Sequence, residues 1–131
     1  DEEVKASKQA LKTKALVEMV SLTVDRKIDM VKILTGQDVS KQSSNVIDLK
    51  LVEAINKDVE AFFNLLKRDN KEVTTESLII SLVDKRILTK EGTIIKYGDV
   101  MIGADMPSAI KYLNSPKNQV LKVQLQEKLT N

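Results

Sequence analysis

The opening segment constrains the fold most, because residues 3–35 contain neither glycine nor proline. Within it, apolar side chains recur every three or four residues, as they do along one face of an α-helix. These side chains are Val17, Val20, Val24, Ile28, Val31 and Leu34. Acidic residues 1–3 suit the N-terminal end of a helix, and Gly36 suits its C-terminal cap. The sequence therefore predicts one long helix over about residues 3–35, roughly 50 Å in length.

A polar connector at residues 37–45 separates this helix from a second one, which the apolar spacing places at about residues 46–68. Ser44 or Asn45 would cap it. Residues 69–72 are expected to end it. A connector of this length favours an antiparallel helix pair.

The strongest β signal lies at residues 93–104, where Gly98 and Asp99 separate two β-prone runs. Such a pair is typical of a two-residue hairpin turn. The expected cross-strand pairs are Tyr97 with Val100 and Ile95 with Ile102. The preceding segment, Lys90 to Thr93, is interpreted as an ordinary turn.

Further helices are predicted on both sides of the hairpin, at about residues 75–88, 107–113 and 116–129. The expected caps are Thr74 or Thr75, Asp105 and Ser115. Proline occupies the first turn of the last two helices, a position that it favours.

The predicted fold class is mainly α with a small β-hairpin (α+β). Residues 1–70 are expected to form a long antiparallel helical hairpin that serves as an oligomerisation or partner interface. Residues 71–131 are expected to form a small unit in the order helix, β-hairpin, helix, helix.

The chain has no cysteine and no histidine, which excludes disulfides, thiolate nucleophiles and the usual zinc sites. Asp25 and Asp29 form the best carboxylate pair, but Arg26 and Lys32 lie beside them, as on an ordinary ion-paired helix surface. We therefore expect no enzyme, no catalytic or metal residue, no cofactor and no small-molecule substrate. A carboxylate-and-metal enzyme is the last-ranked alternative.

The longest apolar-rich stretch, residues 15–24, contains Glu18 and is shorter than the ~20 residues that span a bilayer. The Asp-Glu-Glu-Val start lacks the basic and apolar segments of a secretory signal. We expect no membrane partner and a cytoplasmic location, or the host cytoplasm if a phage encodes the chain.

A helix of roughly 50 Å is longer than a compact domain of this size, so the shorter second helix would leave part of its apolar stripe uncovered. The chain is therefore expected to pack against itself or another protein, for example through a coiled coil. The expected interface residues are Leu11, Val17, Val20, Val24, Ile28 and Val31.

Nucleic-acid binding is the alternative, although a net charge of +2 is small for it. A helix followed by a hairpin resembles the end of a winged-helix module, which presents these two elements to DNA. The candidate phosphate contacts are Lys5, Lys8, Lys12, Lys85, Arg86 and Lys96. Against this, Glu76 and Asp84 give the third helix a mixed charge, and lysine stripes are more often solvated faces.

Two functions remain open. The first is a non-enzymatic helical assembly or adaptor protein, and a phage or mobile-element role in particle assembly or DNA packaging suits the lysine-rich composition. The second is a winged-helix-like DNA-binding protein that uses residues 75–88 and 93–104.

Overall fold

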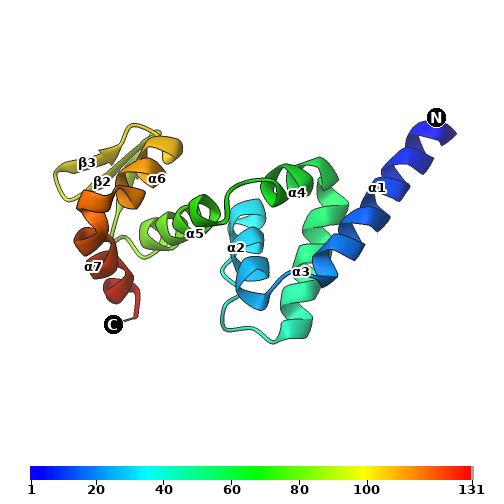
Figure 1. Ribbon diagram of the computed structural model, residues 1–131, viewed down its shortest axis with the longest axis horizontal. Coiled ribbons are helices and arrows are strands. Elements are labelled where there is room, and N and C mark those ends of the chain that lie inside the picture. The colour runs from blue at the N-terminus through cyan, green and yellow to red at the C-terminus, as the bar shows by residue number, and fades with distance from the viewer. Residues whose placement is uncertain (131) are drawn as a thin grey trace. The chain divides into compact units, whose positions relative to one another are not determined.

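The structure, a computed structural model, describes residues 1–130. The chain divides into two compact units, one of residues 1–68 and one that begins at Asp69. The predicted fold class is confirmed, because helices dominate and the strands form one small antiparallel sheet (Figure 1). None of the described helices combines the length and the apolar character needed to cross a bilayer.

The single helix predicted over residues 3–35 is wrong, because two helices take its place: α1 (Glu2–Val20) and α2 (Val24–Thr35). The Ser21 hydroxyl donates a 2.9 Å hydrogen bond to the carbonyl oxygen three residues earlier. The Thr23 hydroxyl accepts a 3.1 Å hydrogen bond from the N–H three residues later and so caps α2. These side chains satisfy backbone groups that a continuous helix would have paired internally, which is why the helix breaks here.

The second predicted helix, residues 46–68, is also divided, into α3 (Ser44–Lys57) and α4 (Val59–Leu66). Asp58 is at once the C-cap of α3 and the N-cap of α4. Its carboxylate accepts a 3.0 Å hydrogen bond from the N–H three residues later. The long helical hairpin predicted for residues 1–70 is therefore replaced by shorter helices with sharp joints.

The first unit is built on the packing of α2 against α3 and α4, while α1 also contacts α3 and α4. Its interior is aliphatic apart from one phenylalanine. The most deeply buried side chains are Ala15, Met30, Val31, Leu51, Ile55 and Phe62.

The second unit opens with α5 (Asn70–Asp84), earlier than the predicted helix at residues 75–88. Asp69 is the cap that sequence reasoning missed, and its carboxylate accepts a 3.2 Å hydrogen bond from the N–H of Glu72. The helix ends before residue 88 because the backbone of Arg86 is left-handed, with φ of 61°. That geometry turns the chain into the sheet.

The antiparallel sheet contains β1 (Thr89–Glu91), β2 (Ile94–Tyr97) and β3 (Val100–Gly103), in that order. The predicted hairpin at residues 93–104 is confirmed. The segment around Gly92, interpreted from sequence as an ordinary turn, instead closes a second hairpin and adds β1. Gly92 has a φ of 62°, which glycine adopts without steric cost.

One of the two predicted cross-strand pairs is confirmed, because Tyr97 pairs with Val100. The other is wrong: Ile95 pairs with Gly103. An irregularity in the ladder after Ile95 shifts the register by one residue, as a β-bulge does. Both Ile95 and Ile102 nevertheless remain buried.

The helix caps were predicted with mixed success. Asp105 caps α6 (Met106–Asn114) as expected, through a 2.9 Å hydrogen bond from the Ser108 N–H. In α3 the cap is Ser43, one residue before the predicted Ser44 or Asn45.

The last helix also begins differently from the prediction. Ser115 makes no side-chain capping bond, and a short 3₁₀ turn, η1 (Pro116–Asn118), precedes α7 (Gln119–Thr130). The Gln119 amide instead donates to the carbonyl oxygens of Leu113 and Ser115, at 3.1 and 2.8 Å.

The core of the second unit joins α5, the sheet, α6 and α7. Its buried members are Ile79, Leu82, Leu88, Ile95, Ile102, Ala109, Ile110, Leu113 and Leu125. Gly103 lets β3 approach α6 closely, because a Cβ there would lie 2.4 Å from the backbone nitrogen of Ala109.

Candidate protein-interaction surface

The N-terminal half of α1 makes no packing contact that buries a side chain. Residues 1–10 are all exposed, and the helix extends beyond α3 and α4 (Figure 1). Burial begins at Leu11, which is half-buried, and continues four and eight residues later at Ala15 and Met19. Val4 lies seven residues before Leu11, on the same helix face, yet it is 51% exposed. The face of α1 that packs on α3 and α4 therefore continues beyond the point where these two helices cover it.

The six predicted interface residues fall into three groups. Val17, Val20 and Val24 are exposed, at 68%, 78% and 50%. Leu11 and Ile28 are half-buried. Val31 is buried completely inside the first unit and so is not exposed to a partner. The break between α1 and α2 ends the common helix face on which the prediction relied.

A groove of 360 Å³ lies where α1 meets the α3–α4 joint. Its lining combines basic, acidic and apolar side chains, namely Lys8, Leu11, Lys12, Asn56, Lys57, Asp58, Val59 and Glu60. Among the described residues, none of the three lysines forms an ion pair. Sequence reasoning missed this groove because it depends on the helix break at Asp58.

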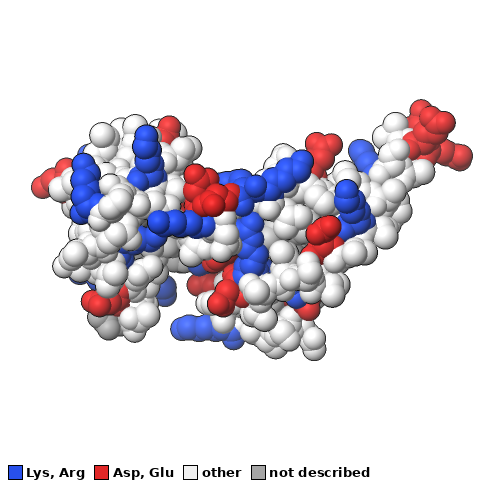
Figure 2. Space-filling model, viewed as in Figure 1, with Lys and Arg blue, Asp and Glu red and all other residues white. Residues whose placement is uncertain are grey.

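Charge is segregated along α1. Figure 2 shows an acidic cluster at the free tip of this helix and basic side chains further along it. The tip carries Asp1, Glu2 and Glu3. Of the predicted phosphate contacts, Lys5 and Lys8 are exposed and Lys12 is half-buried. The structure brings Lys8 and Lys12 to the same groove as Lys57.

The predicted phosphate contacts of the second unit lie in two places. Lys85 and Arg86 are exposed where α5 ends. Lys96 lies within β2 and forms a 3.3 Å ion pair with Glu91 of β1. Its charge is therefore partly neutralised within the sheet.

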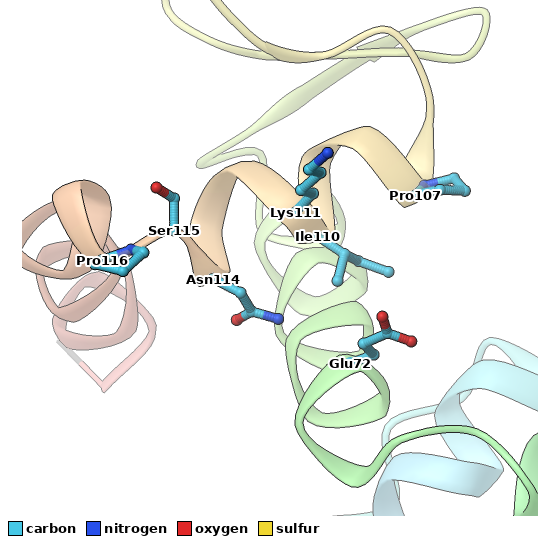
Figure 3. Close-up of a pocket in the computed structure, with 7 residues that line it drawn as sticks. All are labelled: Glu72, Pro107, Ile110, Lys111, Asn114, Ser115 and Pro116. Carbon is cyan, nitrogen blue, oxygen red and sulfur yellow. The ribbon is translucent and has the colours of Figure 1, made fainter.

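A second groove, of 590 Å³, lies between α5 and α6. In Figure 3, Ile110 and Asn114 reach from α6 toward α5, where Glu72 lies, while Lys111 points away from Glu72. Over residues 1–130, no group of three or more metal-ligating side chains converges here or elsewhere. This groove is a hollow between two packed helices, and charged, polar and apolar side chains line it.

Near this groove, a polar network joins three helices of the second unit. The Lys122 ammonium donates to Asn114 Oδ1 at 2.8 Å and to Thr75 Oγ1 at 3.1 Å. Thr75 in turn donates to Asn114 Oδ1 at 2.7 Å. Burial, with the nearby charge of Lys71, lowers the pKa of Lys122 below its usual value. The network holds α7 to α5 and α6, a structural role that no sequence motif indicated.

Two carboxyl groups have lowered pKa values for local structural reasons. Partial burial raises the pKa of Asp38, but the hydrogen bonds from Ser40 and the charges of Lys32 and Lys41 together leave the pKa below its usual value. The hydrogen bonds from Ser108 lower the pKa of Asp105. Asp38 thus orders a turn and Asp105 a helix start.

Comparison with known proteins found no match to the chain among protein-family models, curated proteins or solved structures. The interpretation of function therefore rests on the surface features described above.

Proposed function

We propose that this chain is a non-enzymatic helical assembly or adaptor protein that associates through α1 with a second copy or another protein. The observation that carries this proposal is the exposure of every residue from 1 to 10 within a formed helix. Short helical segments without tertiary packing are marginal in water. A partner packed along this segment would supply the contacts that the chain's own unit does not.

Exposed valines support the same proposal. Val17 and Val20 lie three residues apart on α1, and Val24 begins α2 a few residues later. Single exposed apolar residues are normal, but neighbouring ones form a patch of the kind that marks interaction sites. A role in particle assembly or DNA packaging in a phage or mobile element would use such a surface.

The direct test is the mass in solution, measured by light scattering over a range of protein concentrations. Wild-type mass is expected to rise above 14.7 kDa with concentration. The triple variant V17S/V20S/V24S should require a higher concentration to associate. V120S is the matched control, because Val120 is 73% exposed on α7, at the other end of the chain. A strictly monomeric wild type at tens of micromolar would remove the self-association half of the proposal.

DNA binding through α5 and the following sheet is the second candidate. It is favoured by the order of these elements and by the exposure of Lys85 and Arg86 where α5 ends. The test is salt-dependent binding to duplex DNA, with K85E/R86E as the variant. Binding that falls with salt and is lost in the variant supports this function. No association of the wild type at about 50 mM salt would dispose of it.

A further inference from the structure

We infer that the tip of α1, residues 1–5, docks in the groove between α1 and the α3–α4 joint of a second copy of this chain. The inference rests on the proposed function and specifies its partner and its contact. It is drawn from three observations: an uncovered helical tip, a groove with free lysines, and a match between the chemistry of the two.

The groove has a mixed character. Lys8, Lys12 and Lys57 give it positive charge without internal ion pairs among the described residues. Leu11 and Val59 give it an apolar floor. Asp58 and Glu60 lie at the α4 side, and the Asp58 carboxylate is already engaged in capping α4. A ligand for this groove should therefore carry acids, one apolar side chain and a base.

The tip of α1 carries this set within consecutive residues. Glu3 would face the groove lysines, Val4 would cover Leu11, and Lys5 would face Glu60. All five tip residues are exposed, and neither glutamate forms an ion pair in the described part of the chain. Glu3 and Lys5 of the tip thus each meet an opposite charge in the groove.

Two copies of the chain can make this contact twice, once in each direction. Tip and groove share α1, and Val4 precedes Leu11 by two helical turns. When two α1 helices lie antiparallel with Val4 of one copy beside Leu11 of the other, the two-fold axis repeats the contact in reverse. The same register places Glu3 beside Lys12 in both directions. The expected product is a closed dimer, because a two-fold contact uses the same patch on both subunits.

A nucleic acid is the competing occupant of the lysine groove. A phosphate backbone offers only negative charge, so Asp58 and Glu60 would repel it and the apolar floor would contact nothing suitable. The helical tip satisfies all three kinds of lining residue. Charge complementarity therefore favours a second copy.

A charge-swap experiment tests the inference. E2K/E3K reverses the tip and K8E/K12E reverses the groove, and each variant alone should weaken self-association by about tenfold or more. An equimolar mixture of the two should recover association, because each reversed tip then meets a groove of opposite charge. Raising salt should weaken wild-type association. Circular dichroism checks that each variant is folded, and K8E/K57E replaces K8E/K12E if the half-buried Lys12 does not tolerate reversal.

The outcomes separate this inference from the proposed function. If V17S/V20S/V24S dissociates while the charge variants associate like wild type, the tip–groove contact is overturned and the proposed function stands. If the mixture does not recover association, the contact is also overturned. If the groove variant weakens self-association, the tip variant does not, and the groove variant also abolishes binding to duplex DNA, the groove binds nucleic acid. If the wild type is monomeric throughout, self-association and this contact both fail.

Discussion

The two terminal helices, α1 and α7, have the same spacing of apolar side chains but differ in how much of that face is buried. In α7, Leu121, Leu125 and Leu129 follow one another every four residues, and all three pack on the core of the second unit. In α1, the side chains that follow the same spacing are Leu11, Ala15 and Met19. The α7 stripe is packed along the whole helix, whereas the same face of α1 continues to Val4, which is exposed.

This difference shows that an apolar stripe predicts a helix face but not what covers it. The cover depends on how far the neighbouring helices extend, and α3 and α4 end short of the tip of α1 (Figure 1). The second unit thus encloses its terminal helix along its length. The first unit leaves half of its terminal helix exposed.

The largest effect should come from breaking the α7 stripe. Leu125 is completely buried, so L125A should lower the free energy of unfolding of the second unit by about 2–5 kcal/mol, through lost burial and a cavity. Denaturant unfolding measures this. The matched control V120A, on the exposed side of α7, should change it by less than about 0.5 kcal/mol. Equal effects of the two variants would contradict the assigned packing of α7.

The next largest effect tests how closely β3 packs against α6 in the second unit. G103A places a Cβ against the backbone of α6, where no side chain can move away. We expect a loss of about 1–3 kcal/mol from overpacking, measured as a lower thermal midpoint. G36A is a useful comparison, because nothing lies within 4 Å of its added Cβ and any cost there comes from the left-handed backbone alone. A G103A variant as stable as wild type would show that β3 and α6 are not in close contact.

The joint that shapes the groove of the first unit comes next. D58A removes the carboxylate that caps α4 and should cost about 0.5–2 kcal/mol in denaturant unfolding. D58N keeps a capping oxygen and should retain most of the stability. If alanine and asparagine behave alike, capping is not what Asp58 contributes.

Removing residues 1–10 sharpens the comparison of the terminal helices. In dilute protein the stability should change by less than about 0.5 kcal/mol, because no side chain in this segment is buried. At high concentration the truncated chain should lose the rise in thermal midpoint that association gives the wild type. A large loss of stability in dilute protein would mean that this segment packs within its own unit.

The smallest effect concerns the pH dependence of the second unit. The pKa of Lys122 is lower in the folded chain than its usual 10.5, so the unfolded chain binds more protons between the two values. The stability of wild type should therefore rise with pH across that window relative to K122M, which has no proton to lose there. Thermal unfolding of both proteins at several pH values measures the difference. A difference that does not change with pH would contradict it.

Much of the fold could be predicted because its signals are local. Asp105 followed by Pro107 marks the start of α6, and the Gly98–Asp99 turn marks the hairpin. The fold class follows from such signals. The break near Ser21 could not be found by apolar periodicity, because the spacing of three and four continues unchanged from Val20 to Val24 across it.

The same break explains why only part of the interaction surface could be predicted. Once α2 turns away, Val31 enters the interior while Val17 and Val20 stay outside, although all three belong to one periodic set. The groove depends on the packing of α1 against α3 and α4, whose joint is distant from α1 in the sequence. No local pattern encodes such a contact.

Hydrogen exchange of the first turns of α1 tests the central claim most directly. The amides of residues 5–10 should exchange fast in dilute protein and become protected as concentration rises, because a second copy then covers this segment. The amides of α7 should show the same protection at both concentrations. Fast exchange of residues 5–10 at every concentration would contradict the account.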